Sequence, residues 1–423
     1  MNRFSLATSL VALLASGALA PAAADVQAEV VSNYADIAEA KYADSLTSAL
    51  ALQSAVDALI AAPSAETMQE AKDAWVASRV PYQQTEVYRF GNAIVDDWEG
   101  KVNAWPLDEG LIDYVDVAYG GPTDENAYAA LNVIANASFT LSGATIDAST
   151  ISASLLEETL QEADGVEANV ATGYHAIEFL LWGQDLNGHG PGAGDRPWTD
   201  YALGDACTGG NCDRRAAYLK AATDLLVSDL EWMAAQWTDD GAARAELMSD
   251  PAAGIVAMIT GMGSLSYGEQ AGERMRLGLM LNDPEEEHDC FADNTHNSHY
   301  YDGLGIQNVY MGAYVRIDGS LVSGPSLSDL VAAVDPELDT EMRMKLSTTM
   351  MALGRIKTAA EAGFAYDQML ERGNAGGEKL IMDAVNALVD QTRSIERVVA
   401  ALSLEAIAFE GSDSLDNPSA VFQ

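Results

Sequence analysis

Apolar residues recur three and four positions apart along most of the chain, which is the spacing of an amphipathic α-helix. The spacing is clearest at 375–409, where one helix face carries Ile381, Val385, Leu388, Ile395, Val399 and Leu402. No run of alternating β-branched residues is long enough to predict a sheet. The pattern therefore predicts an all-α fold.

Segments rich in glycine, proline and small polar residues divide this pattern into helices. Ser64 is a suitable N-cap for the second helix, and the helices are expected at about 26–61, 64–90, 127–139, 151–163, 166–182, 214–237, 252–281, 303–313, 336–371 and 375–409. We expect two bundles of the four-helix type, over 25–200 and 201–423. A short similarity between 86–91 and 273–278 suggests that the bundles are related by an internal duplication.

The N-terminal segment has the pattern of an export signal. Arg3 precedes an apolar stretch, and three alanines ending at Ala24 provide a cleavage site, which predicts a signal peptide at 1–24. No other stretch is apolar enough to span a bilayer, so an integral membrane protein is not expected. Cys207 and Cys212 flank a turn-rich spacer and are candidates for a disulfide in the periplasm or cell envelope.

The chain is strongly acidic, with 64 Asp and Glu residues against 22 Lys and Arg and a formal net charge of -42. Such a charge repels nucleic acid and anionic lipid, which makes both poor partners. It attracts cations, which is compatible with a protein that handles metal ions.

Candidate chemistry is concentrated in an apolar helix that contains His175 and Glu178. Their spacing of three residues places both side chains on one helix face. An imidazole and a carboxylate so close together can share a metal ion, or one can orient the other through a hydrogen bond. A second polar stripe with helical spacing, bordered by apolar residues, consists of Arg79, Tyr82, Glu86 and Arg89.

Other polar segments have competing explanations. Asp108 lies near a predicted helix N-terminus, where the helix dipole alone favours a carboxylate, and a ligand role competes with that on even terms. The residues at 283–301 are crowded with Asp, Glu and His, which is typical of a cation site and also of acidic turns. The long loop at 186–213 contains His189 and is a candidate cover for a site.

Four blocks of sequence resemble the imelysin family, in particular its iron-regulated branch. They are Gly173-x-His175-x-x-Glu178 with its apolar continuation, and the segments 80–90, 103–108 and 287–296. The resemblance implies an exported bacterial protein of two helical bundles, with a site near their interface and a role in iron uptake. Together with helix spacing it nominates four metal ligands: His175, Glu178, Glu86 and Asp108.

The expected metal is iron, with zinc as the other candidate, because mixed nitrogen and oxygen ligands suit both. Residues expected to bind a ligand or support the site are Arg79, Tyr82, Arg89, Trp105, Tyr267, Glu273, Arg276, Asp293 and His296. Convergence of Arg79, Arg89 and Arg276 would indicate a small anionic iron ligand.

Two alternatives to metal binding are retained. The family also has a metallopeptidase label, M75, but the sequence contains no His-Glu-x-x-His motif, so an enzyme is not expected. The third hypothesis is a non-catalytic module that interacts with iron-transport proteins of the envelope.

Overall fold

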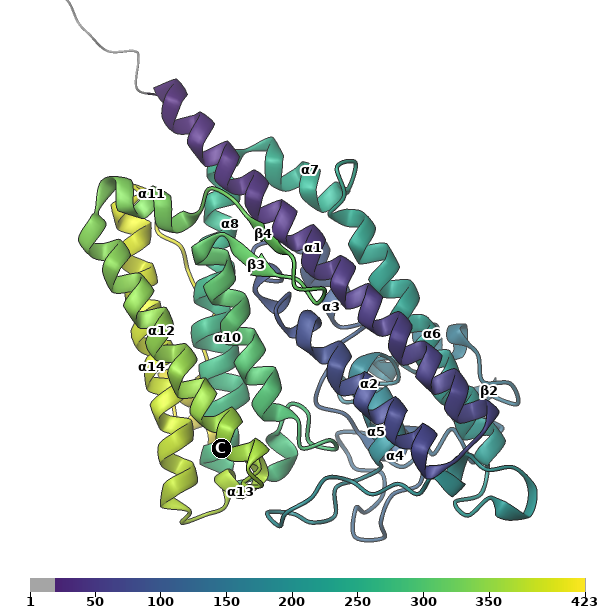
Figure 1. The fold of residues 1–423 in the computed structure, drawn as a ribbon. Coiled ribbons are helices and arrows are strands. Elements are labelled where there is room, and N and C mark those ends of the chain that lie inside the picture. Colours follow the sequence, from purple (N-terminus) through teal and green to yellow (C-terminus); the bar gives the residue numbers. More distant parts are fainter. Residues whose placement is uncertain (1–19, 423) are drawn as a thin grey trace, which may run out of the picture.

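The computed structural model describes residues 20–422, with side chains from residue 25 onward. Helices make up most of this part of the chain, which confirms the predicted fold class (Figure 1). Two short antiparallel hairpins, missed in the sequence, pair β1 (Ser138–Leu141) with β2 (Ala144–Asp147) and β3 (Ala313–Val315) with β4 (Leu321–Ser323). The predicted signal peptide lies outside the described residues, apart from the backbone of 20–24.

Four helices form the first bundle. The 42-residue helix α1 (Ala20–Ala61) packs against α2 (Ala65–Gln83) and α6 (Cys212–Gln236), and α5 (Gly173–Trp182) packs against both α2 and α6. The predicted boundary at residue 200 separates α6 from α1 and α5, against which it packs. A capping box at Ser64 begins α2, so that predicted N-cap is confirmed.

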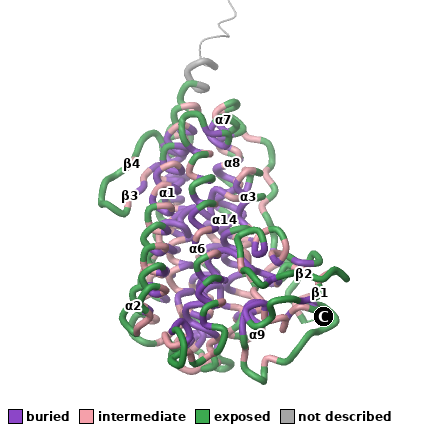
Figure 2. The backbone as a smooth tube through the Cα atoms, turned by 90° about the vertical axis from the view of Figure 1, so that its right-hand side faces the viewer, coloured by how far each residue is buried: buried purple, intermediate pink, exposed green. Residues whose placement is uncertain are grey.

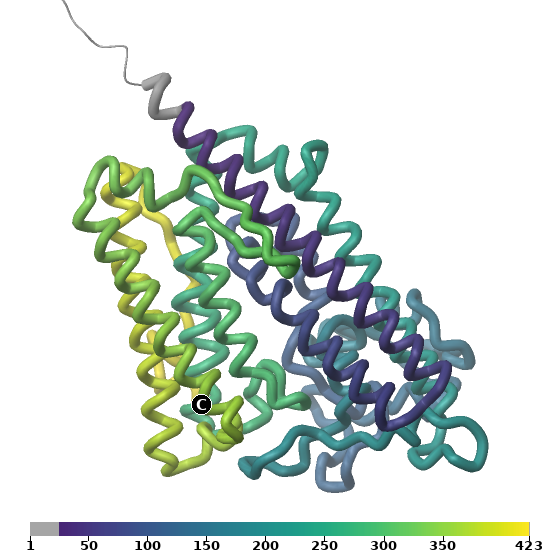
Figure 3. Tube along the Cα trace, in the orientation of Figure 1, coloured from purple at the N-terminus to yellow at the C-terminus, as the bar shows by residue number. Residues whose placement is uncertain are grey.

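The second bundle lies beside the first (Figure 3). Its members are α8 (Pro251–Ser264) with its π-helical continuation η6 (Leu265–Arg276), α10 (Thr295–Met311), α12 (Pro336–Glu361) and α14 (Ala375–Ala401). Contacts of α1 with α8 and of α2 with α10 join the bundles. A large hydrophobic core extends through both bundles, and a second apolar cluster is confined to the second bundle. The interior of the molecule is buried along its length (Figure 2).

Short elements connect the long helices. They are η1 (Glu86–Tyr88), α3 (Ala93–Glu99), α4 (Glu109–Ile112), η2 (Leu155–Leu160), η3 (Ala163–Gly165), η4 (Trp198–Tyr201), η5 (Gly204–Ala206), α7 (Ala242–Ser249), α9 (Leu277–Leu281), η7 (Pro284–Glu286), α11 (Leu327–Val334), α13 (Tyr366–Leu370), α15 (Asp413–Asp416) and η8 (Ala420–Phe422). No helix fills 127–139, where Ser138 already begins a hairpin strand. The predicted helix at 64–90 ends early, at Gln83.

The other differences concern helix ends. The helix predicted at 303–313 begins earlier, at Thr295, and the one predicted at 336–371 ends at Glu361, before the left-handed Gly363. Cys207 and Cys212 form the predicted disulfide, and Cys290 is a free thiol. Among the described residues, none of the helices has the length and apolar character required to cross a bilayer.

Candidate functional site

The helix that contains His175 begins at Gly173 because contacts with Val102 and Trp75 fix its first turn. Gly173 has a φ of +79°, and a Cβ there would lie 2.4 Å from the carbonyl oxygen of Val102. The same carbonyl accepts a hydrogen bond from the backbone N–H of Tyr174 at 2.8 Å. Trp75 Nε1 donates to the carbonyl of Tyr174, so the first turn of α5 is fixed from two sides. The helix therefore starts seven residues later than the predicted 166.

His175 and Glu178 form a hydrogen bond inside the protein. Nδ1 of His175 lies 3.0 Å from Oε2 of Glu178, and both side chains are almost completely buried. The second carboxylate oxygen of Glu178 accepts a hydrogen bond from the backbone N–H of Ala292 at 2.9 Å. Nε2 of His175 is buried and has no hydrogen-bond partner. That nitrogen is the atom of the motif that remains available to a ligand.

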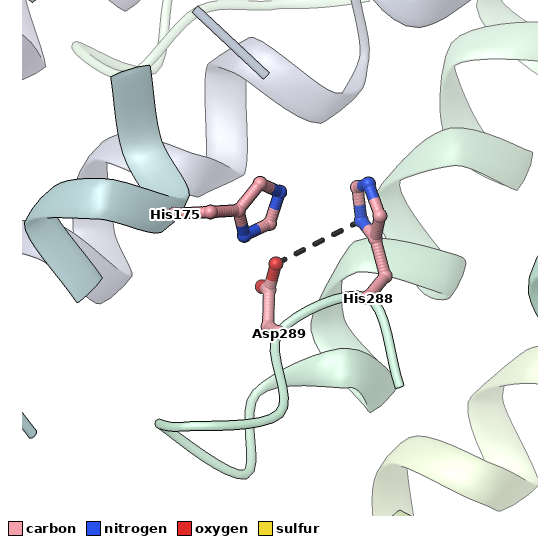
Figure 4. A group of neighbouring side chains, drawn as sticks. All are labelled: His175, His288 and Asp289. Atoms are coloured by element: carbon pink, nitrogen blue, oxygen red, sulfur yellow. Dashed lines mark ion pairs between the residues drawn. The ribbon is translucent and has the colours of Figure 1, made fainter. Parts of the chain in front are cut away.

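The segment between η7 and α10 brings two further groups to His175. His288 and Asp289 supply atoms that, with one atom of His175, all lie within 4.8 Å of one another. The two imidazole rings lie on either side of the Asp289 carboxylate in an edge-to-face arrangement, with ring centroids 4.8 Å apart (Figure 4). Within residues 20–422 this is the one group of three or more His, Cys, Asp or Glu residues so closely spaced. The two bundles therefore both contribute to the centre.

A buried guanidinium supports this group. Nη2 of Arg79 donates to Oδ1 of Asp289 at 2.8 Å, and Nη1 donates to Asn103 Oδ1 at 2.7 Å. Oδ2 of Asp289 accepts hydrogen bonds from Asn294 and Ser298, so both carboxylate oxygens have partners. Asp289 is thus ionised and held in a fixed orientation.

The contacts of His288 are weaker. Its Nδ1 lies 3.4 Å from Arg79 Nη2 and 3.3 Å from Gln83 Nε2, both of which can only donate. The same nitrogen is 3.7 Å from Asp289 Oδ1, the pair marked in Figure 4. Nδ1 of His288 is therefore an acceptor whose two contacts are longer than ordinary hydrogen bonds.

Burial sets the protonation of the centre. Burial, with Arg79 nearby, lowers the pKa of His175 to about 3, and burial with Arg274 nearby holds the pKa of His288 well below its usual value. Burial alone would raise the pKa of Asp289, but the Arg79 charge brings it below the usual range. At neutral pH the centre contains two neutral imidazoles and a carboxylate, the forms that bind metals.

These donors fit a metal ion with a small adjustment. Metal bonds to imidazole and carboxylate measure roughly 2.0–2.2 Å, so ligand atoms of one ion lie at most about 4.4 Å apart. The spacing of 4.8 Å exceeds this by a few tenths of an ångström. Glu178 is placed to orient His175 through Nδ1, the arrangement common for metal-bound histidines.

The remaining two predicted ligands have other partners. Oε2 of Glu86 accepts from Arg274 Nη2 at 2.7 Å, and Arg274 also bonds Asp302 and Glu269. Asp108 accepts hydrogen bonds from Tyr119 and Asn126. Neither carboxylate belongs to the His175 group.

The predicted supporting residues divide into two sets. Arg79 contacts the centre directly, the Tyr82 ring packs at a tilt against Tyr174 with centroids 4.8 Å apart, and Trp105 lies edge-on to His288 with ring centroids 6.1 Å apart. The others lie elsewhere or are held by other groups. Arg89 pairs with Asp96, Tyr267 bonds Asp416, and Arg276 donates to the Ser414 carbonyl, so the three predicted arginines do not converge.

A cavity of about 640 Å³ reaches the centre at His288 and Trp105. Its lining is dominated by carboxylates, namely Asp96, Glu99, Glu162, Glu167, Glu269, Glu273 and Glu286, against the two cations Arg89 and Arg274. The predicted supporting residue Glu273 therefore lies on the wall of this cavity. An acidic passage of this kind favours cations over anions.

Two residues of the centre, His288 and Asp289, were not singled out in the sequence. The crowding of acids and histidines at 287–296 predicts a cation site, with Asp293 and His296 as the residues expected to support it. Hydrogen bonds to Asn294, Thr295 and Ser298 turn Asp289 inward, and no periodic pattern announces such a loop. The sequence signal for these two ligands is that His288 and Asp289 are adjacent in a block that resembles the family.

The fold and site define a helical protein of two packed bundles, with a buried histidine and carboxylate centre where they meet. The family model for imelysin, Peptidase_M75, matches residues 38–395. The chain therefore belongs to the imelysin family, which confirms the resemblance noted in the sequence.

One solved structure has a similar fold over almost its whole length. It is that of a putative iron-regulated protein A precursor from Parabacteroides distasonis ATCC 8503, with a TM-score of 0.63 and 21% sequence identity. The similarity covers 90% of this chain and 95% of that chain. No curated protein sequence matches the chain.

Proposed function

We propose that this chain is an exported imelysin-family protein that binds an iron ion through His175, His288 and Asp289, in bacterial iron uptake or homeostasis. The main support for the proposal is that Nε2 of His175 is buried and has no hydrogen-bond partner. His175 also belongs to a closely spaced group of three potential ligands. A buried polar atom without a partner is costly, and a bound ion removes that cost.

Iron is placed before zinc for one reason, which is a comparison and not the ligand chemistry. Two imidazoles and a carboxylate suit iron, zinc and manganese, so the ligand types alone leave a choice among them. The similar solved structure is described as an iron-regulated protein, which favours iron. In this proposal Glu178 orients His175 rather than binding the ion, while Glu86 and Asp108 stay predicted ligands that would have to leave their present partners.

The acidic cavity supplies a route for the ion. Its carboxylates raise the local cation concentration next to His288, which lines the cavity. A hydrated cation fits this charge pattern better than an anionic iron chelator. Transfer to envelope iron-transport proteins is the corresponding proposal for partners, and co-purification from envelope extracts tests it.

We do not propose a peptidase. Metallopeptidases of the zincin type use a glutamate as general base beside the metal. Here one oxygen of Glu178 is bonded to His175 and the other accepts from the Ala292 backbone. Neither oxygen is directed at a water that a metal at His175 Nε2 would bind.

Calorimetric titration of Fe(II) under anaerobic conditions, and of Fe(III) and Zn(II), tests the proposal. We expect one site per chain in the wild type and at least a hundredfold weaker binding in His175→Ala and His288→Ala. His296→Ala is the matched control because His296 does not belong to the group. Equal iron binding by wild type and His175→Ala would refute the proposed site.

A further inference from the structure

A second group of carboxylates lies outside the His175 centre, around a small enclosed cavity of about 10 Å³. Asp185 and Gly188 line it from the loop after α5, Glu285 and Glu287 from the segment around η7, and Asp367 from α13. The cavity has room for about one water-sized occupant. Three segments that are far apart in the sequence therefore meet at one point.

Three carboxylate oxygens of Glu287 and Asp367 are buried without a hydrogen-bond partner, while the side chain of Thr295 bonds the Glu287 carboxylate. Glu287 and Asp367 are each 1% exposed. Oε2 of Glu287 and both carboxylate oxygens of Asp367 have no hydrogen-bond partner, although the backbone N–H of Gln368 is near enough to Asp367 to act electrostatically. Oδ1 of the nearby Asp293 is likewise buried and unpartnered. Buried carboxylate oxygens are costly unless hydrogen bonds or a cation satisfy them.

No positive side chain neutralises this group. Within residues 20–422, Asp185, Glu287, Asp293 and Asp367 form no ion pair, whereas the carboxylates of the His175 centre and of the Glu86 network are matched by Arg79 and Arg274. Burial and the charge of Asp367 raise the pKa of Asp293 to about 7. The carboxylates thus destabilise one another, and a divalent cation is the simplest group that would offset their charge.

We propose that this cavity is a second cation site, one for a hard divalent ion of the calcium type, with Glu287 and Asp367 as its protein ligands and Asp185 and Asp293 beside it. Calcium and magnesium prefer carboxylate and water oxygens, and no nitrogen or thiolate is needed. No three of these carboxylates lie as close together as the ligand atoms of the His175 centre, so an ion shared by three of them would have to draw them together. Like charges with no ion between them are expected to lie apart.

The position of the site gives it a structural role. His189 Nδ1 donates to the Asp367 backbone carbonyl at 2.8 Å, so the loop after α5 already contacts α13. A cation at Glu287 and Asp367 would join the His288 segment to α13, in the second bundle. Since Glu287 directly precedes His288, the ion would also hold the segment that completes the first metal centre.

Thermal unfolding of the full chain with calcium or magnesium, each against EDTA, tests the inference. We expect millimolar calcium to raise the Tm of the wild type by several degrees, because a ligand that binds only the folded state stabilises it. In Asp367→Asn the gain should disappear, while the Tm in EDTA stays equal or rises because one unpaired charge is removed. His175→Ala should keep the gain, which separates this site from the iron site.

Terbium luminescence provides an independent measurement if a variant folds poorly. Terbium can take the place of calcium. The charge of Glu287 acts on the Tyr366 hydroxyl, so this tyrosine lies near the site and can transfer its excitation energy to the ion. We expect sensitised emission that calcium displaces, with at least tenfold weaker terbium binding in Asp367→Asn and unchanged binding in the exposed control Asp239→Asn. No calcium-dependent gain in Tm together with no displaceable emission would overturn the inference.

Discussion

Nδ1 of His175 lies 3.0 Å from Oε2 of Glu178, and through this hydrogen bond the glutamate of the motif orients the histidine. Glu178→Gln should therefore weaken iron binding about 10- to 100-fold, the usual effect of losing a partner of a metal-bound histidine. Binding should persist, in contrast to its loss in His175→Ala. Calorimetry measures both affinities, with the exposed Glu66→Gln as control. Complete loss of binding in Glu178→Gln would instead make Glu178 a ligand.

Gly173→Ala should destabilise the protein, because the new Cβ would approach the Val102 carbonyl at 2.4 Å and the residue has a φ of +79°. Gly143→Ala is the matched control: Gly143 has a φ of +78°, but no atom lies within 4 Å of its added Cβ. In the control the free energy of unfolding should fall only by the cost of a left-handed backbone at a residue with a Cβ, about 1–2 kcal/mol. In Gly173→Ala it should fall by clearly more. Urea unfolding measures both losses, and equal values would show that the close contact with Val102 is unimportant.

Arg79→Met should lower the free energy of unfolding of the metal-free protein by about 3–5 kcal/mol, because it leaves Asp289 buried and unpaired. Bound metal should recover part of this loss, since the cation then neutralises Asp289. Arg397→Met, which removes an exposed ion pair with Glu341, should cost less than about 1 kcal/mol. Chemical denaturation with and without metal checks these values. The same metal-induced gain in wild type and Arg79→Met would separate Asp289 from the metal site.

Ionisation of the buried Glu99 should lower the free energy of unfolding as the pH rises. Burial, with Glu86 nearby, raises the pKa of Glu99 to about 7 in the folded protein, against about 4.5 in the unfolded chain. The folded state therefore binds the proton more tightly, and its stability falls between about pH 4.5 and pH 7 by at most about 3 kcal/mol. Glu99→Gln should remove this part of the decline, as unfolding at pH 5 and pH 8 will show. An unchanged pH dependence would mean that Glu99 is ionised throughout.

The helical pattern predicted the fold class because an apolar stripe with a period of 3.6 residues identifies a packed helix. The ends of helices depend on contacts that the pattern does not contain. The start of α5 is set by the Val102 carbonyl, which lies about 70 positions earlier in the chain, and the hairpins at Ser138 and Ala313 are too short to show alternation. The division of the chain into domains at residue 200 and the internal duplication stay predictions.

At the site, the motif pair was found because helical spacing places His175 beside Glu178. The partners of the other candidates were not accessible from local sequence: Glu86 is matched by Arg274, which is 188 positions away, and Arg79 by Asp289, which is 210 positions away. Such pairings follow from how the two bundles pack. The apolar residues that border the stripe predict that Arg79 and Glu86 are buried, but the sequence does not identify the residues with which they pair.

The most direct test of the iron proposal is the anomalous diffraction of crystals grown with iron, recorded on both sides of the iron absorption edge. We expect one strong peak among His175 Nε2, His288 Nδ1 and Asp289 Oδ1, and no such peak in crystals of His175→Ala. A peak bound by Glu86 or Asp108 in place of these atoms, or no ordered iron in protein that binds it in solution, would contradict the account.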